Sequence, residues 1–252
     1  MHEEKCFITL TYDQQNVPQS ASLNKRDWQL FMKKLREKVA PKKIRFFMAG
    51  EYGSKGNRPH YHAIIFGHQF DDMVEWKKTK TGAVWISKTL ETVWGAGFTS
   101  VGTVTAQSAA YVAKYCQKRV SGEAAKKMNP ITGLRHYERI DTTTGEITTV
   151  EPEFACMSNR PGIGASWLDK WETDALPRDE IRIDGKVRRV PEYFLGRFKA
   201  RDESLNKGKM FRDVEFKRWL KSEEFKDDRT PERLAVREAV AKASITKREE
   251  IF

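Results

Sequence analysis

The most constraining feature of this 252-residue chain is a pair of strand-like segments joined by a short, turn-rich loop. Residues 44–52 (IRFFMAGEY) and 60–66 (HYHAIIF) are rich in aromatic and β-branched side chains, which is typical of β-strands. The seven residues between them, GSKGNRP, carry the Gly and Asn that favour a hairpin loop. We therefore expect two antiparallel neighbours in a sheet, and any fold of this chain has to be built around them.

Other segments of the first 150 residues add helices and further strands. A helix is predicted after Asn24, because apolar residues recur there at helical spacing until Pro41 stops the pattern. Further helices are expected at 86–94 and 106–119, strands at 6–12 and 98–104, and a second hairpin at 136–140 and 146–150. This mixture predicts an α+β fold with a central antiparallel sheet flanked by helices.

We expect two domains. Residues 1–177 would form the sheet domain, with the second hairpin as an insertion, and residues 178–252 a charged, mainly helical C-terminal extension. The extension holds 21 Lys and Arg against 16 Asp and Glu, so most of its surface should be solvated.

The composition narrows the class of partner. The chain has 46 Lys and Arg against 35 Asp and Glu, a net charge of +11, which favours a polyanion such as nucleic acid. No segment approaches the roughly 18 apolar residues of a membrane span, and the N-terminus lacks a signal-peptide pattern. Its three scattered cysteines suit neither a zinc site nor a disulfide framework. We expect a soluble protein that stays inside the cell, with no membrane partner.

Two histidines on the second hairpin strand are candidate metal ligands. Because side chains alternate along a strand, His60 and His62 share one face, about 6 to 7 Å apart, while Tyr61 lies on the other. If Tyr52 pairs with Pro59, then Glu51 lies opposite His60 on the same face. Two imidazoles and a carboxylate would suit a divalent cation with open coordination positions. The plainer interpretation is a pair of partly buried histidines with ordinary hydrogen bonds.

Two tyrosines are candidate nucleophiles. Tyr111 and Tyr115 are four residues apart on a predicted helix and therefore share a face, with Lys114 between them. A tyrosine hydroxyl is a poor nucleophile at its usual pKa of about 10, but a metal-bound phosphate and a nearby cation would assist its attack on phosphorus. The alternative is an aromatic stripe that packs onto the sheet. The combination of the tyrosine pair, the histidines and a basic chain favours the chemical interpretation.

At these motifs the sequence resembles the HUH endonucleases. It is most similar to the replication initiator proteins of microvirus-type single-stranded DNA phages, particularly the gokushovirus branch. The resemblance rests on three motifs in order, at 7–12 (FITLTY), 58–62 (RPHYH) and 111–115 (YVAKY). It extends over about residues 5 to 195 through GEYG at 50–53, WGAGF at 94–98 and MSNRPGIG at 157–164. It implies an RRM-like or palm-like core. Family members commonly carry additional sequence before the first motif, which begins here at residue 5, so we expect a shortened N-terminus or a chain that starts late.

The resemblance also implies a metal-dependent reaction. His60, His62 and Glu51 would hold Mg²⁺ or Mn²⁺ against a nonbridging oxygen of the scissile phosphate.

The same resemblance implies roles on the helix. Tyr111 or Tyr115 would attack phosphorus and form a 5′-phosphotyrosine link with release of a 3′-OH, and Lys114 would offset transition-state charge or assist the nucleophile. The second tyrosine would make the second cut that rolling-circle replication needs. The implied partners are single-stranded DNA at a replication origin, a host helicase and a host DNA polymerase, in the cytoplasm of the bacterial host.

Other classes of function remain open at this point. Two histidines and a carboxylate also describe the metal triad of a non-haem Fe(II) oxygenase, which would leave the tyrosine pair unexplained and expects a double-stranded barrel. A plasmid relaxase or a transposase would share the motifs. A non-catalytic nucleic-acid-binding protein would keep the positive charge without needing the histidines or tyrosines.

Overall fold

The computed structural model divides into two compact units, His2–Pro161 and Gly162–Phe252. The structure describes residues 2–18, 20–53, 56–79, 82–115, 119–141, 144–176, 178–183, 185–204, 214, 216–221 and 230–249. The division falls before the boundary expected after residue 177. Helix α5 (Ala165–Ala175) belongs to the second unit, because its Leu168 and Ala175 are buried in the apolar cluster of that unit.

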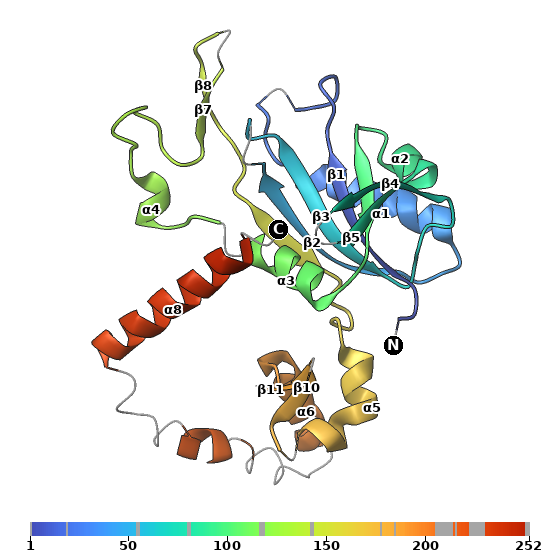
Figure 1. The fold of residues 1–252 in the computed structure, drawn as a ribbon, viewed down its shortest axis with the longest axis vertical. Coiled ribbons are helices and arrows are strands. Elements are labelled where there is room, and N and C mark those ends of the chain that lie inside the picture. Colours follow the sequence, from blue (N-terminus) through green and yellow to red (C-terminus); the bar gives the residue numbers. More distant parts are fainter. Residues whose placement is uncertain are drawn as a thin grey trace. The chain divides into compact units, whose positions relative to one another are not determined.

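The first unit is built on a seven-stranded sheet whose neighbouring strands are all antiparallel (Figure 1). The strand order is β4-β5-β6-β1-β3-β2-β9. The bounds are β1 (Lys5–Thr11), β2 (Arg45–Tyr52), β3 (Pro59–Phe66), β4 (Met73–Thr79), β5 (Gly82–Ser87), β6 (Thr99–Gly102) and β9 (Phe154–Met157). The α+β class with a central antiparallel sheet is confirmed. The predicted hairpin is β2–β3, and its register pairs Tyr52 with Pro59 and Glu51 with His60, as expected.

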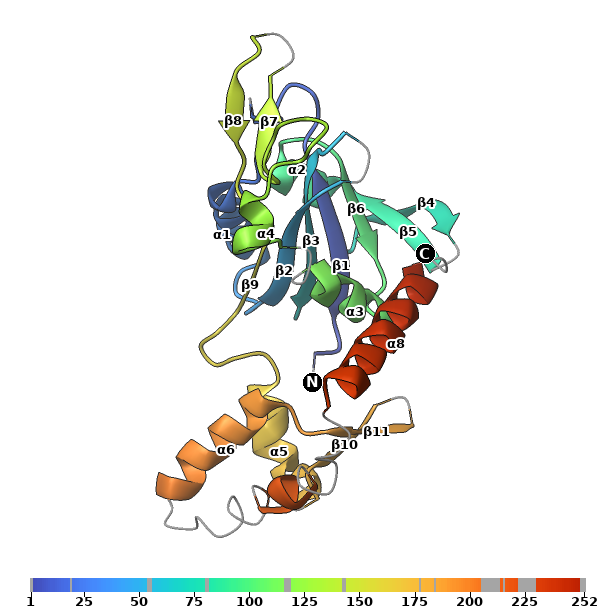
Figure 2. The ribbon, with the colours of Figure 1, turned by 90° about the vertical axis from the view of Figure 1, so that its left-hand side faces the viewer.

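Helices cover both faces of this sheet. Figures 1 and 2 show α1 (Lys25–Val39) and α2 (Lys88–Trp94) on one face and α3 (Ala106–Tyr115) on the other. The side chain of Asn24 caps α1 by accepting a hydrogen bond from the Arg26 N–H, and four residues at helical spacing on α1 are buried. They pack with the apolar side chains of β1 and β3 in the main core. The smaller cluster under α3 contains Val112, Ala49 and Ile64.

Several elements of the first unit differ from the sequence expectation. The segment before α2 is the hairpin β4–β5, so the helix begins at residue 88 rather than 86. The edge strand β9 was not predicted, and helix α4 (Glu123–Lys126) reaches into a segment expected to be loop from residue 126. Helix α3 is described as far as residue 115, and residues 116–118 of the predicted helix lie outside the described part. The second predicted hairpin is present as β7 (Glu138–Ile140) and β8 (Ile147–Thr149).

The second unit combines helices with a small hairpin. Besides α5 it contains α6 (Glu192–Ser204), α8 (Pro231–Glu249) and a two-stranded sheet of β10 (Glu180–Ile183) and β11 (Lys186–Arg189). The extension was expected to be mainly helical, and the hairpin is the exception to that expectation. None of the helices in the described part of the chain is long and apolar enough to cross a membrane.

Candidate functional site

Strand β3 distributes its side chains between a core and a polar site. Tyr61 is buried on the α1 side, where its hydroxyl donates to the Asn24 carbonyl at 2.9 Å and lies 2.8 Å from the Tyr12 hydroxyl. Burial raises the pKa of Tyr61 to about 12, so this phenol stays neutral. His60 and His62 lie on the opposite face, which α3 covers. The predicted separation of the two histidines from Tyr61 is therefore present.

His62 is held by one residue from each neighbouring strand. Its Nε2 lies 2.8 Å from Oε1 of Glu51 on β2, and its Nδ1 lies 3.0 Å from the hydroxyl of Thr9 on β1. With Glu51 ionised, Nε2 carries the proton and donates it, so Nδ1 accepts from the Thr9 hydroxyl. Glu51 and His62 are both buried, at 4% and 6% exposure. The ring of Phe7 stacks on His62 with centroids 5.9 Å apart.

His60 lies beside this pair but is turned toward the hairpin loop. Its ring centroid is 6.3 Å from that of His62, and its Nε2 would be only 3.0 Å from a Cβ placed on Gly53. Its Nδ1 is buried and has no hydrogen-bond partner among the described residues. Burial lowers the pKa of His60, outweighing the opposite effects of the Pro59 backbone and Glu51. The imidazole is therefore neutral near pH 7 and able to serve as a ligand.

The predicted metal triad is in register but its three side chains do not converge. Among the described residues no group of three His, Cys, Asp or Glu side chains is placed so that it could hold a metal ion. The reason is local: His62 Nε2 is occupied by Glu51, and the His60 ring lies against Gly53. The donor types still suit a divalent cation, and the unpartnered His60 Nδ1 is a nitrogen that no neighbouring group satisfies. His60, His62 and Glu51 remain the residues that would hold one.

Helix α3 brings one of the two predicted tyrosines to the histidines. The ring of Tyr111 lies edge-on to His62, with centroids 5.5 Å apart, and also contacts Phe7. Val112, the next residue, is fully buried between α3 and the sheet and so fixes this face of the helix. Lys114 is half-buried on the same helix. The side chain of Tyr115 lies outside the described residues, although its backbone ends α3, one turn beyond Tyr111.

Two residues of this site escaped the sequence analysis. Thr9 and Phe7 hold and stack against His62, and both belong to the first of the three motifs. Their alternation with the buried Ile8 would have shown that they share a face. Placing that face beside His62 requires the pairing of β1 with β3, in which Thr9 lies opposite His62. Such long-range pairing is not readable from the β1 residues alone.

The fold and the site together define an α+β sheet domain with two histidines, a glutamate and a helix-borne tyrosine on one face. Residues 5–120 match the family model of the replication-associated protein ORF2. The predicted resemblance to the replication initiators of microvirus-type phages is thereby confirmed.

Three curated relatives agree with this match. The chain is 30% identical over 209 residues to the replication-associated protein VP4 of Bdellovibrio phage phiMH2K, covering 79% of this chain and 59% of that protein. It is 28% identical over 200 residues to the replication-associated protein ORF2 of Spiroplasma virus 4, covering 75% and 56%. The corresponding values for the replication-associated protein ORF4 of Chlamydia phage 1 are 34% over 126 residues, 47% and 31%. The chain thus spans less than two thirds of the length of these relatives. No solved structure matches it.

Proposed function

We propose that this protein initiates rolling-circle replication of a single-stranded DNA phage genome as a site-specific nicking and closing endonuclease. The family match over residues 5–120 supports the role in replication. The observation that carries the chemistry is the contact of Tyr111 with His62, which is itself bonded to the buried Glu51. A phenol beside a potential cation site on an open sheet face is suited to attack on a phosphodiester.

The proposed reaction is a transesterification. The Tyr111 oxygen forms a bond to phosphorus as the phosphorus–O3′ bond breaks; the phenol loses its proton and the departing 3′ oxygen gains one. A 5′-phosphotyrosine and a free 3′-OH result. Because one phosphoester replaces another, a 3′-OH can later attack the phosphotyrosine and reseal DNA without a further energy source.

The residues around the tyrosine have defined tasks in this proposal. Thr9 and Phe7 fix the orientation of the His62 ring, and Glu51 balances its charge. A Mg²⁺ or Mn²⁺ ion, when bound by Glu51, His60 and His62, would supply positive charge to the phosphate. Lys114, on the same helix as Tyr111, would add a second cation near the developing charge.

The second tyrosine accounts for the two cuts that rolling-circle synthesis requires. Tyr115 follows Tyr111 by four residues on α3, a spacing that puts the two Cβ atoms about 6 Å apart on one face. One tyrosine would hold the first 5′ end while the other cleaves the regenerated origin. The substrate is single-stranded origin DNA, and a host helicase and DNA polymerase would act with the protein in the bacterial cytoplasm.

The observed sheet argues against the oxygenase alternative. Its edge strands are β4 and β9, which do not pair with each other in the described structure, so the sheet is open rather than a closed barrel. An iron oxygenase would also give the tyrosine beside His62 no task.

The test is covalent adduct formation. Wild-type protein is incubated with origin-containing single-stranded oligonucleotides and Mn²⁺, and the products are separated on a denaturing gel. We expect an adduct with wild type and with Tyr193→Phe, a matched control in the second unit. We expect none with the Tyr111→Phe/Tyr115→Phe double variant. Absence of an adduct with every divalent metal, or an undiminished adduct with the double variant, would refute the proposal.

A further inference from the structure

We propose that the β10–β11 hairpin is a binding surface for double-stranded DNA that inserts into the major groove. This surface is separate from the nicking residues and goes beyond the proposed single-strand chemistry. The argument rests on the exposure of the hairpin, its charge, the way its base is held and its lack of aromatic side chains.

The hairpin is exposed on both faces. Its strands pair only with each other, in a register that places Ile181 opposite Arg188 and Ile183 opposite Lys186. Apart from the half-buried Ile181, which packs against the core of its unit, every described residue of the two strands is exposed. Such a free two-stranded ribbon contributes little to the core, so its exposure calls for another explanation.

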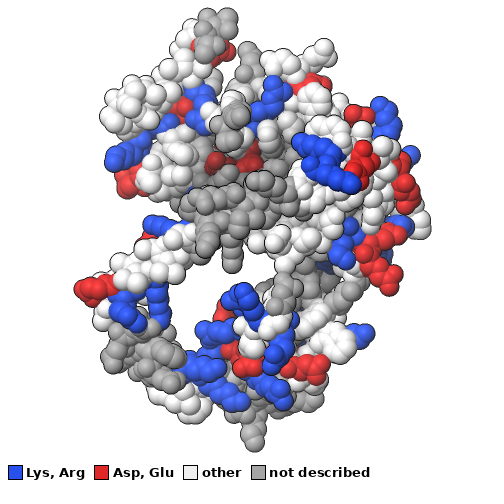
Figure 3. Space-filling model, in the orientation of Figure 1, with Lys and Arg blue, Asp and Glu red and all other residues white. Residues whose placement is uncertain are grey.

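The ribbon carries unneutralised positive charge on both faces. Because paired residues share a face, Lys186 and Arg188 project from one side and Arg182 and Arg189 from the other. Arg182, Lys186 and Arg188 have no acidic partner among the described residues, whereas Arg189 lies 3.6 Å from Asp179. Figure 3 shows Lys and Arg gathered over this part of the second unit. Cations on both faces would meet phosphates on both walls of a groove.

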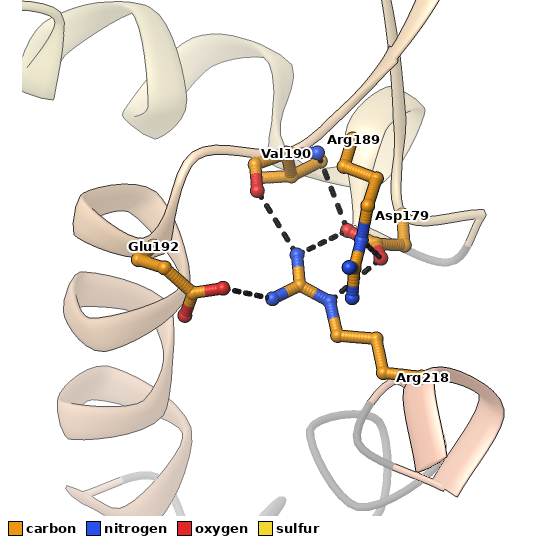
Figure 4. Close-up of polar contacts among 5 residues, drawn as sticks. All are labelled: Asp179, Arg189, Val190, Glu192 and Arg218. Carbon is orange, nitrogen blue, oxygen red and sulfur yellow. Dashed lines mark hydrogen bonds and ion pairs between the residues drawn. The ribbon is translucent and has the colours of Figure 1, made fainter. Parts of the chain in front are cut away.

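A buried ion pair holds the base of the ribbon (Figure 4). Asp179 directly precedes β10 and Val190 directly follows β11. Arg218 donates two hydrogen bonds of 2.6 Å to the Asp179 carboxylate and one of 2.9 Å to the Val190 carbonyl. The Val190 N–H in turn donates to Asp179 at 3.3 Å. The two ends of the hairpin are therefore tied together, which lowers the ordering cost of binding.

Double-stranded DNA fits this ribbon better than a single strand does. The major groove is about 12 Å wide and admits a two-stranded β-ribbon. Surfaces that bind single strands combine cations with aromatic side chains on which the bases stack. The sequences of β10 (EIRI) and β11 (KVRR) contain no aromatic residue. The ribbon thus has the shape and charge for a duplex backbone and lacks the stacking platforms for unpaired bases.

The test compares two triple variants of the full chain with equal loss of charge. Arg182→Ala/Lys186→Ala/Arg188→Ala alters the ribbon. The control, Arg26→Ala/Lys34→Ala/Lys38→Ala, removes three exposed cations from α1. Binding to labelled duplex and single-stranded DNA of one length is followed by fluorescence anisotropy over a range of salt concentrations. EDTA is present to prevent cleavage, and circular dichroism verifies that each variant is folded.

We expect the ribbon variant to lose at least tenfold in duplex affinity at low salt. Its plot of log affinity against log salt should become less steep by about 2 to 3, since each phosphate contact contributes about 0.9. The control, and single-strand binding by the ribbon variant, should change less than threefold. Equal losses in both variants, an equal loss for single strands, or no duplex binding by wild type would overturn the proposal. Failure of the nicking function would show instead as a missing covalent adduct, which this assay does not measure.

Discussion

The ion pair between Arg218 and Asp179 should dominate the stability of the second unit. We expect Arg218→Ala to destabilise that unit by several kcal/mol, because it leaves the Asp179 carboxylate buried without its main partner. The Asp179 side chain is 9% exposed and that of Arg218 is 13% exposed, so neither charge is well solvated. By contrast, Glu192, which also pairs with Arg218, is 84% exposed.

The magnitude follows from these exposures. Removing one partner of a buried ion pair costs about 3 to 5 kcal/mol, whereas an exposed pair contributes about 0 to 1 kcal/mol. Arg189 remains 3.6 Å from Asp179 after the substitution, which places the expected loss near the lower value, about 3 kcal/mol. With a urea slope of about 2 kcal/mol per molar, the unfolding midpoint should fall by about 1.5 M. Glu192→Ala should shift it by less than about 0.5 M.

The assay must separate the two units. Hydrogen exchange measured by mass spectrometry across a urea series reports peptides of residues 162–221 and 2–161 separately. We expect Arg218→Ala to lower the midpoint for the first set only. A loss no larger than that of Glu192→Ala would refute the argument, because it would mean that Asp179 is solvated or well partnered without Arg218.

The effect of Arg218→Ala should depend on pH in a defined direction. Burial by itself would raise the pKa of Asp179, but the hydrogen bonds and charge of Arg218 outweigh it and lower that pKa. The pair therefore stabilises the folded state above the unfolded pKa of about 3.9, and this contribution is lost as the pH falls through the lower folded value. The difference between wild type and variant should be full at pH 6 to 7 and shrink below about pH 4.

Two further predictions concern the first unit. Gly97→Ala should cost about 3 kcal/mol or more, since φ is +141° and a Cβ would lie 2.2 Å from the Asp13 backbone nitrogen; Gly56→Ala, at φ +74° with open space, should cost about 1 to 2 kcal/mol in the same urea experiment. An equal cost would show that the close approach at Gly97 is relieved cheaply. Because burial lowers the pKa of His60, its contribution to stability should be lost as the pH falls below about 6.5, where the unfolded chain takes up the proton first. His60→Gln should therefore lose less stability than wild type between pH 7.5 and 5.5, and equal losses would contradict this assignment.

Local pattern sufficed to predict much of the fold. The β2–β3 register followed from a hairpin loop of known length and from the strand period, so Glu51 was placed opposite His60 before any coordinates. Helix α1 was predictable because its apolar residues recur at helical spacing after a capping Asn24. In both cases neighbours in sequence are neighbours in space.

The features that were missed depend on long-range contacts or on solvation. Strand β4 is exposed or half-exposed along its whole length, so its sequence lacks the alternation that a buried face imposes. The β10–β11 hairpin has no buried face except near Ile181, and its charge resembled that of a solvated helix. The turn of the His60 ring toward Gly53 is a side-chain rotation, which strand register leaves undetermined.

Strand β3 shows why the core and the candidate site constrain each other. Its odd-numbered residues, including Tyr61, enter the main core, while His60 and His62 face α3. A slip of one residue in pairing would place both imidazoles among the apolar side chains of that core and Tyr61 over the site, so burial energy alone selects the register that exposes the histidines to α3. The hydroxyl of Tyr61 strengthens this selection, because it finds its partners at Asn24 and Tyr12 only on the core side. The chemistry on one face is thus positioned by the packing on the other, and we expect core substitutions beneath Tyr61 to disturb the Glu51–His62 contact before they unfold the sheet.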